Sequence, residues 1–404
     1  MRVVQINITY GHGSTGIIAR LIADMLTANG DESFVAYDGY NNYQVGNDYP
    51  IGNKWFYRLH SHLFTKLLDK EGFGSYIPTK GLCCWLDRIQ PDVIHLHNIH
   101  GSYINLPVLF DYINDHHIPV VMTLHDCWTM TGHCYHFDAV GCDKWKTGCF
   151  ECPLHCKYPV SVGPDNSRCN YKRKKRIFTS LNNAHVVSVS HFIDDVVSQS
   201  YLNCFPHSVI YNGINIDVFK PKETDLRSEL GIAKDRIILL GVSSGWSDDK
   251  GLAEMIWLSK DQRFQVILIG VQSNLRGMLP SNIFAIGRTE SQDQLAEYYS
   301  IADCFVNPTY NDSFPTVNIE ALGCGTPIAT YRTGGSPEAI DENTGAVVER
   351  EDKEALKDAV LKLVSSNRDI IRTYCRNRAE LLFDQNNCYR DYLGIYNEII
   401  LTKQ

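Results

Sequence analysis

The amino-acid sequence predicts an α/β protein built from two doubly wound, Rossmann-like domains. Its 404 residues exceed one typical core and suit two domains of ordinary size. Short apolar segments alternate with amphipathic ones along both halves, which favours parallel sheets flanked by helices. Hydrophobic residues form 44% and charged residues 21% of the chain, a composition typical of globular proteins.

The first half begins with a strand, a glycine loop and a helix, which is how a doubly wound sheet begins. These elements are expected at Val3–Ile8, Gly11–Gly16 and Ile17–Leu26. The loop is not a dinucleotide-binding fingerprint, because no acidic residue follows on a second strand at the required distance. Further strands are expected at Ser33–Tyr37, Val93–His97, Val120–Leu124 and Val186–Ser190.

A turn signal at Tyr211-Asn212-Gly213 marks the expected hinge between the two domains. We therefore divide the chain into 1–212, 213–388 and a final helical segment, 389–404, that is placed to return to the first domain. In the second domain, strands are expected at Ile237–Val242, Phe264–Ile269, Ile283–Ile286, Cys304–Val306 and Pro327–Thr330.

The loop after the strand Cys304–Val306 is the most informative part of the chain. It carries two carboxylates eight residues apart, Asp312 and Glu320, with a helix expected from Asn318 to Leu322. Backbone N–H groups near such a helix start lack partners and attract anions and sugar hydroxyls. The plainer interpretation is a capped helix with ordinary surface acids.

A family resemblance favours a ligand-binding site at this loop over a capped helix with surface acids. D-S-F-P-T-V-N-I-E-A-L-G-C-G-T-P followed by T-G-G-S-P-E resembles the E-x7-E donor-site motif of the family-four retaining glycosyltransferases. H-L-H-N-I-H-G-S-Y-I-N-L-P at 95–107 and T-L-H-D-C-W-T-M-T-G-H-C at 123–134 resemble, more narrowly, the colanic-acid and capsular-polysaccharide branch. The resemblance spans most of the chain and implies the GT-B architecture, in which two Rossmann-like domains face each other across a cleft.

The resemblance also implies roles for residues of the second domain. Glu320 matches the glutamate that binds the nucleotide ribose, and Asp312 stands where a longer glutamate would hold the transferred sugar. Lys250 matches a phosphate-binding lysine, but Gly245 replaces the usual arginine five residues earlier. Arg288 or loop N–H groups are candidates to supply the missing charge. Backbone groups of Phe314, Pro315, Thr316 and Val317 are expected to face the donor.

In the first domain, His125 and Asp126 directly follow an expected strand, where open α/β sheets bind ligands. The resemblance implies that the histidine contacts the donor sugar; the plainer interpretation is a cap for the next turn. Gly13 and Gly16 match a glycine loop that lets a diphosphate or acceptor approach the backbone closely.

The implied reaction moves a sugar from a nucleotide-diphosphate donor to a saccharide acceptor, with retention of configuration. UDP sugars are favoured and GDP sugars remain open. The acceptor is expected on polyprenyl diphosphate, in capsular, exopolysaccharide or O-antigen synthesis, and catalysis needs neither a metal nor a protein nucleophile. Two rivals remain: a catalytically silent sugar-nucleotide-binding scaffold, which the missing arginine favours, and a sugar-nucleotide epimerase or phosphorylase on the same fold.

Seven of the fourteen cysteines lie in the loop 127–169. Cys149 and Cys152 form a C-x2-C pair, and Cys134 and Cys142 lie close enough upstream to complete four thiolates around a structural zinc ion. His133, His136 and His155 are substitute ligands. Free thiols that pack the loop and a redox pair are the alternatives.

The net charge of −8 argues against nucleic-acid binding. The N-terminus shows no signal-peptide pattern, and no apolar run is long enough to span a bilayer, so we expect a cytoplasmic protein. Lys54–Leu68 mixes aromatic, leucine and basic residues at helical spacing. It predicts either a core-facing helix or one that docks to the inner leaflet.

Overall fold

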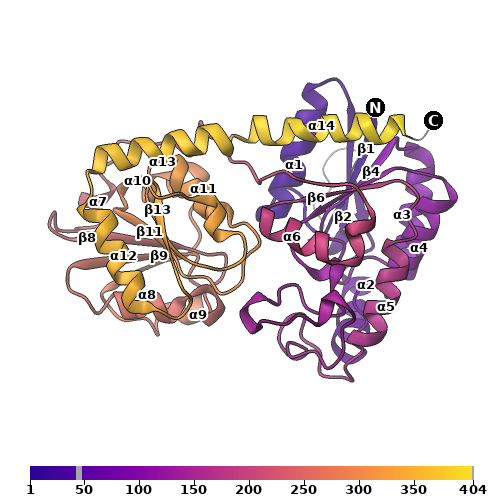
Figure 1. The fold of residues 1–404 in the computed structure, drawn as a ribbon, viewed down its shortest axis with the longest axis horizontal. Coiled ribbons are helices and arrows are strands. Elements are labelled where there is room, and N and C mark those ends of the chain that lie inside the picture. The colour runs from indigo at the N-terminus through magenta and orange to yellow at the C-terminus, as the bar shows by residue number, and fades with distance from the viewer. Residues whose placement is uncertain (42–47, 403–404) are drawn as a thin grey trace. The chain divides into compact units, whose positions relative to one another are not determined.

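The computed structural model describes residues 1–41 and 48–402. The chain forms two compact units, one of Met1–Ile210 with Tyr389–Gln404 and the other of Tyr211–Cys388. Each unit is a parallel sheet with helices on both faces (Figure 1), so the prediction of two Rossmann-like α/β domains is confirmed.

The N-terminal unit contains a seven-stranded sheet of order β3-β2-β1-β4-β5-β6-β7. Helix α1 lies on one face of this sheet, and α3, α4 and α5 lie on the other (Figure 1). The strands are β1 (Arg2–Asn7), β2 (Glu32–Asp38), β3 (Tyr49–Ile51), β4 (Val93–Leu96), β5 (Val120–Leu124), β6 (Ala184–Ser188) and β7 (His207–Val209). The helices are α1 (Gly13–Ala28), α2 (Lys54–Leu59), π-helical η2 (His60–Leu67), α3 (Tyr76–Ile89), α4 (Leu106–Asp115), α5 (Ser167–Phe178) and α6 (His191–Gln199), with 3₁₀ turns η1 (Gly39–Asn41), η3 (Trp128–Met130), η4 (Asp138–Val140), η5 (Lys144–Lys146) and η6 (Tyr201–Cys204).

The C-terminal unit contains a six-stranded sheet of order β10-β9-β8-β11-β12-β13. The strands are β8 (Ile237–Val242), β9 (Phe264–Ile269), β10 (Ile283–Ile286), β11 (Cys304–Asn307), β12 (Ile328–Tyr331) and β13 (Gly345–Val348). The helices are α7 (Leu226–Glu229), α8 (Leu252–Leu258), α9 (Ser273–Arg276), α10 (Gln292–Ile301), α11 (Thr316–Gly323), α12 (Lys353–Ser365) and α13 (Arg368–Leu382), with 3₁₀ turns η7 (Asp248–Lys250) and η8 (Ser336–Ala339). The last helix, α14 (Gln385–Leu401), begins in this unit and belongs to the N-terminal unit from Tyr389 onward.

The ten strands expected from the sequence are all present, each within two residues of its predicted ends. The four segments that form the centre of the C-terminal sheet, β8, β9, β11 and β12, are almost wholly buried, as apolar runs predict. The sequence did not reveal β3, β7 and β13, which are edge strands of three or four residues. The helix expected at 318–322 starts earlier, at Thr316, directly after Pro315.

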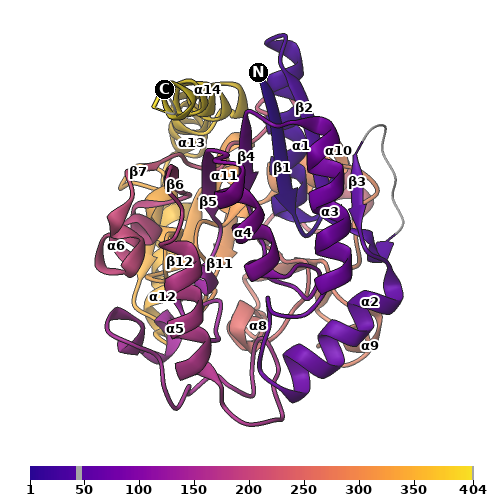
Figure 2. The ribbon, with the colours of Figure 1, turned by 90° about the vertical axis from the view of Figure 1, so that its right-hand side faces the viewer.

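From Tyr389 onward, α14 packs against the N-terminal sheet, and Figure 2 shows this helix nearly along its axis, next to the C-terminus. Tyr396 shares a 2.7 Å hydrogen bond with Nδ1 of His95 on β4, and Tyr392 shares one of 2.9 Å with Thr123 on β5. Asn183 donates to the carbonyl of Ile399. These polar contacts fix the register of α14 on the sheet.

Each sheet has one point where the strand order reverses. In the N-terminal sheet it lies between β1 and β4, and in the C-terminal sheet between β8 and β11. At such a point the loops that follow the two strands leave in opposite directions and open a crevice beyond the carboxyl ends of the strands. The site residues predicted from the sequence lie mainly in these loops.

Candidate functional site

Lys250 and Asp312 meet beyond the carboxyl ends of β8 and β11. The ammonium of Lys250 lies 3.2 Å from Oδ2 of Asp312 and also donates to the carbonyl of Asn311, at 3.2 Å. The side chains of Lys250 and Asp312 keep 37% and 25% of their surface exposed. The ion pair is therefore open to solvent and to a ligand, and its own contribution to stability is small.

A close backbone approach brings these two loops together. Gly251, directly after Lys250, has a φ of +72°, and a Cβ there would lie 2.4 Å from the carbonyl oxygen of Pro308. The amide of Tyr310 donates to the carbonyl of Asp249 across the same contact. Glycine at 251 is thus required both by the left-handed turn and by the space available.

Glu320 lies in the second turn of α11, half-buried, and accepts a 2.9 Å hydrogen bond from the hydroxyl of Tyr299. Burial raises the pKa of Glu320 to about 7, and the hydrogen bond from Tyr299 opposes that rise. The carboxyl group is therefore partly protonated at neutral pH. A ligand that donates two hydroxyls to Glu320 would favour the charged form.

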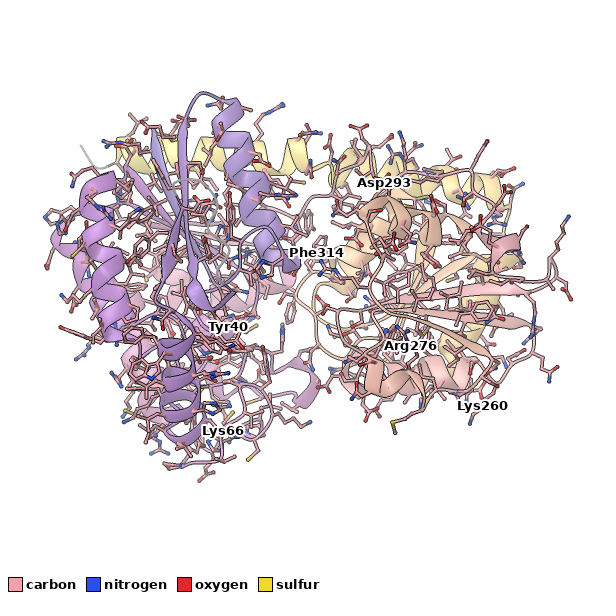
Figure 3. The ribbon with its side chains drawn as sticks, turned by 180° about the vertical axis from the view of Figure 1, so that it is seen from behind. Tyr40, Lys66, Lys260, Arg276, Asp293 and Phe314 are labelled. Carbon is pink, nitrogen blue, oxygen red and sulfur yellow. The ribbon has the colours of Figure 1, made fainter. Side chains whose placement is uncertain are left out.

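The segment from Phe314 to Val317 forms the entry to α11. Pro315 occupies the N-cap position without a side-chain cap, and Thr316 and Val317 start the first turn, where N–H groups point out of the helix. The ring of Phe314 stacks on Tyr211 with centroids 4.8 Å apart, and its carbonyl accepts a hydrogen bond from Asn212. Phe314 is labelled in Figure 3. These contacts fix the loop that leads into the helix.

Arg288 does not join this cluster. It follows the edge strand β10, two strands from β8, and its side chain is exposed. At Gly245, where the resemblance leads one to expect arginine, Nε2 of Gln272 lies 3.1 Å from the position that a Cβ would take. Gln272 also bonds both backbone groups of Trp246. A neutral amide thus occupies the space beside position 245.

In the N-terminal unit, His125 ends a relay of hydrogen bonds that determines its tautomer. Gln5 donates its amide N–H to the carbonyl of Ala19, so its Oε1 faces Nε2 of His97 at 3.0 Å. His97 must then donate from Nε2, and its Nδ1 accepts from Nε2 of His125 at 3.1 Å. Burial lowers the pKa of His125 to about 4. The ring is therefore neutral at pH 7, with Nδ1 left as a hydrogen-bond acceptor.

Asp126, the next residue, is bound on both sides. Its Oδ2 lies 2.7 Å from Nε2 of His100, and its Oδ1 accepts the amide of Trp128. Burial pushes the pKa of Asp126 upward, but the charge of His100 and these hydrogen bonds outweigh it and lower the pKa to about 2. Attraction to Asp126 likewise outweighs burial and raises the pKa of His100. Asp126 is therefore ionised throughout the physiological range.

The glycine loop after β1 leads into α1. Gly13 has a φ of +66°, which a residue with a side chain adopts only with strain. A Cβ on Gly16 would lie 2.7 Å from Oγ1 of Thr9, so Gly16 is required by packing. The two glycines shape the loop on the β1 side of the reversal point, opposite His97 on the β4 side.

The predicted metal ligands Cys134, Cys142, Cys149 and Cys152 line one small pocket in the loop between β5 and α5, together with His133. The thiols of Cys134 and Cys152 share a hydrogen bond. Among residues 1–41 and 48–402, however, the candidate ligand atoms that all lie within 4.8 Å of one another belong to Asp69, His155 and Asp165.

Sequence reasoning missed four side chains that hold the predicted ones in place: Gln5, His97, His100 and Tyr299. His97 follows His95 by two residues, so the two share a face of their strand, and Gln5 sits on β1 opposite His95. This alternation predicts that Gln5 and His97 lie close together, provided that β1 and β4 are known to be neighbouring strands. Nothing in the sequence linked Tyr299 to Glu320.

Comparison with known proteins shows to which family the chain belongs. Residues 16–218 match the family model described as Glycosyltransferase Family 4, and residues 224–381 match the model described as Glycosyl transferases group 1. The chain belongs to glycosyltransferase family 4. This glycosyltransferase is 24% identical over 304 residues to WcaC of Escherichia coli (strain K12), whose name describes it provisionally as a colanic acid biosynthesis glycosyl transferase. The match covers 71% of each chain.

Solved structures show the same fold. Sucrose-phosphate synthase from Thermosynechococcus elongatus matches all of this chain and is itself matched over its full length, with a TM-score of 0.70 and 17% identity. Anabaena HepE in complex with UDP-glucose matches 98% of this chain and all of its own, with a TM-score of 0.65 and 15% identity. The protein is therefore a glycosyltransferase of the GT-B type.

Proposed function

We propose that this glycosyltransferase transfers a sugar from a nucleotide-diphosphate donor to a saccharide acceptor with retention of anomeric configuration. The observation that carries the proposal is the convergence of Lys250 and Asp312 at the strand-order reversal of the C-terminal sheet, with Glu320 on the helix that follows. Three groups suited to a diphosphate, a sugar and a ribose thus come from two adjoining loops and the helix that follows them.

The donor is bound by the C-terminal unit. Lys250 and the N–H groups of Thr316 and Val317 face the diphosphate, where cations and helix N-termini stabilise negative charge. Glu320 accepts hydrogen bonds from the ribose, and Asp312 accepts them from the transferred sugar. HepE structures contain UDP and UDP-glucose, which supports a UDP sugar as the first donor to test.

The reaction needs no protein nucleophile or catalytic metal. The bond between the anomeric carbon and the β-phosphate oxygen breaks while the acceptor oxygen bonds to the same face of the sugar. The acceptor proton passes to the departing phosphate oxygen. Lys250 stabilises the charge on that phosphate, and this interaction strengthens as the bond breaks. The neutral His125 accepts a hydrogen bond from a hydroxyl of the transferred sugar.

A transfer assay tests the reaction. Purified protein is incubated with UDP- or GDP-sugars and a polyprenyl-diphosphate-linked saccharide, and the anomeric configuration of the product is read from its proton coupling constant by NMR. We expect the product to have the same anomeric configuration as the donor. An inverted product would contradict retention, and epimerised nucleotide sugar without transfer would identify an epimerase.

The acceptor is proposed to be lipid-linked, and the surface of α2 and η2 supports contact with an anionic bilayer. The helical segment 54–67 carries Lys54, Arg58 and Lys66 but no acidic residue. One row of its side chains is apolar and exposed: Trp55 by 63%, Leu59 by 41%, Leu63 by 38% and Leu67 by 50%. A helix that only faced the core would bury this row, so the exposure favours docking.

Within the described residues, no helix has the length and apolar character needed to cross a bilayer. Docking by this row would therefore be peripheral. In cosedimentation with vesicles, the double variant Trp55→Ser/Leu63→Ser is expected to lose at least about tenfold in affinity for phosphatidylglycerol-containing membranes. Met278→Ser, which removes an apolar side chain of the other unit that is 79% exposed, is the control. Equal losses in both proteins would contradict docking by α2 and η2.

A further inference from the structure

The cysteine loop between β5 and α5 holds features that neither sugar transfer nor membrane docking uses. Four cysteines, 134, 142, 149 and 152, line one pocket although they span 19 residues of an irregular segment. The segment has only short 3₁₀ turns, η3, η4 and η5, before α5 begins. The backbone hydrogen bonds of this segment are mostly between residues three to five positions apart, so they form local turns and do not themselves bring the four cysteines together.

Two of these sulfurs accept backbone hydrogen bonds. The amide of Gly132 donates to Sγ of Cys149 at 3.1 Å, and the amide of Leu154 donates to Cys152. A Cβ on Gly132 would lie 2.1 Å from the carbonyl of Ser167, so only glycine permits this approach. Amide groups aimed at sulfur stabilise thiolate, the form that ligates metals.

A buried histidine faces the same pocket. His133 is 2% exposed, lines the pocket and donates from Nδ1 to Asp69. Its Nε2 is buried and has no hydrogen-bond partner. Leaving a buried ring nitrogen without a partner is unfavourable, so the pocket is built to hold something polar. A carboxylate behind the distal nitrogen is the arrangement that orients histidines beside metal ions.

A buried cation lies beside the cysteines. Lys174 on α5 is 1% exposed, sits over the ring of Trp128 and donates to the carbonyl of Trp128. Among the described residues, no carboxylate forms an ion pair with it. Burial lowers the pKa of Lys174 to about 8, and negative charge on Cys149, Glu71, Cys134 or Asp126 would oppose that change. A buried ammonium requires a nearby anion, and a zinc ion with four thiolates carries a net charge of −2.

We propose that Cys134, Cys142, Cys149 and Cys152 bind one structural zinc ion, with Lys174 as its buried counter-charge and His133 as a hydrogen-bonding neighbour of the thiolates. Zinc–sulfur bonds of about 2.3 Å place the four sulfurs about 3.8 Å apart. Because the sulfurs are not yet grouped within 4.8 Å, the side chains must rotate inward around the ion. The site is closed and takes no part in sugar transfer.

Asp69, His155 and Asp165 are better suited to frame this site than to bind an ion themselves. Asp69 accepts the amide of Asn166 besides the ring of His133, and Asp165 accepts the amides of Cys152 and Ser167. Their oxygens already satisfy backbone donors. The carboxylates thereby hold His133 and Cys152 toward the pocket.

Metal analysis of full-length protein purified without chelator tests the proposal. We expect about one zinc per chain, lost in Cys149→Ser and in Cys152→Ser and kept in Cys204→Ser, whose thiol is exposed and lies outside the loop. Three results would each overturn the proposal. The first is less than about 0.1 zinc per chain with all four thiols reactive in the native protein. The others are a disulfide between any two of these cysteines and an unchanged zinc content in Cys149→Ser.

Cobalt substitution keeps the test informative if the serine variants fail to fold. Wild-type protein reloaded with Co²⁺ is expected to show tetrahedral ligand-field bands, with sulfur-to-cobalt charge-transfer intensity matching four thiolates. Octahedral cobalt spectra, or charge-transfer intensity of two thiolates or fewer, would contradict the four-cysteine site. These readouts depend on metal content alone and do not rest on the proposed transferase reaction.

Discussion

The two loop clusters of this glycosyltransferase hold their polar groups in different ways. In the N-terminal unit, His125 and Asp126 are each fixed by a further side chain, His97 and His100, before any ligand arrives. In the C-terminal unit, Lys250 and Asp312 bind each other, half-exposed, and Glu320 has a pKa of about 7. The first cluster is preorganised; the second must exchange partners or lose a proton when it binds a ligand.

The largest effect is expected from Lys250, because its interaction is strongest when the phosphate departs. Lys250→Ala should lower turnover of the nucleotide sugar by about 10²–10³-fold and weaken donor binding much less. Turnover and calorimetric donor affinity are to be compared with those of Lys260→Ala, an exposed lysine of the same unit. A similar loss in both variants, or a loss confined to affinity, would remove Lys250 from the reaction.

Activity should depend on the hydrogen bonds that link Gln5, His97 and His125 in the N-terminal cluster. His125→Ala is expected to lower kcat/KM by about 10–10²-fold, since one hydrogen bond to the transferred sugar is lost. Gln5→Leu, which touches no ligand, should cost less but in the same direction, because His97 is then free to adopt the other tautomer. His185→Ala on β6 serves as the control. Full activity in Gln5→Leu would show that the tautomer of His125 is not determined by this relay.

Glu320 predicts a pH dependence that the N-terminal cluster should lack. With a pKa of about 7, roughly a tenth of Glu320 is ionised at pH 6 and about nine-tenths at pH 8. Donor affinity should therefore rise about tenfold over this interval and become nearly flat in Glu320→Gln. Calorimetric titrations at matched ionic strength measure both profiles. An identical rise in the variant would assign the pH effect to another group.

The same shift has a consequence for stability. The folded-state pKa of Glu320 lies above its unfolded value of 4.5, so its ionisation destabilises the fold progressively as pH rises from about 4.5 through 7. Glu320→Gln should then raise Tm by about 2–4 °C at pH 8 and have little effect at pH 4.5. A uniform change at both pH values would contradict the assignment.

The smallest effect is expected where α14 meets the N-terminal sheet. Tyr396→Phe removes the partner of Nδ1 of His95, a fully buried group, at a cost of about 1–2 kcal/mol. Thermal denaturation should show a decrease of a few degrees in Tm, with donor affinity unchanged. Weaker donor binding in this variant would mean that α14 affects the C-terminal cluster as well.

The sequence predicted the fold well because buried parallel strands are continuous apolar runs. β5, β8, β9 and β10 match their predicted ends at every residue. The strands it missed lie at sheet edges, where three or four residues give too short a signal. Lys250 and Asp312 were predicted as separate binding groups through a family resemblance. Their mutual ion pair depends on the approach of Gly251 to Pro308, which no local pattern encodes.

The side chains behind the site residues were harder to predict for the same reason. Gln5 and His97 are 92 positions apart, and their contact follows from the pairing of β1 with β4. Glu320 was predicted to bind the ribose, but the sequence did not predict its raised pKa, which results from burial beside Tyr299. Tertiary neighbours, not sequence spacing, thus decide how each predicted group is charged and oriented.

A thermal-shift series with UDP-, GDP- and ADP-sugars on wild-type protein and Glu320→Ala tests whether a nucleotide sugar binds at β8, β11 and α11. A ligand present at about 100 times its Kd stabilises the native state by about 2.7 kcal/mol, which is readily seen as a higher Tm. We expect one nucleotide class to raise the Tm of wild-type protein and to leave that of Glu320→Ala unchanged. An equal shift in both proteins, or no shift with any donor, would contradict a nucleotide-sugar site at β8, β11 and α11.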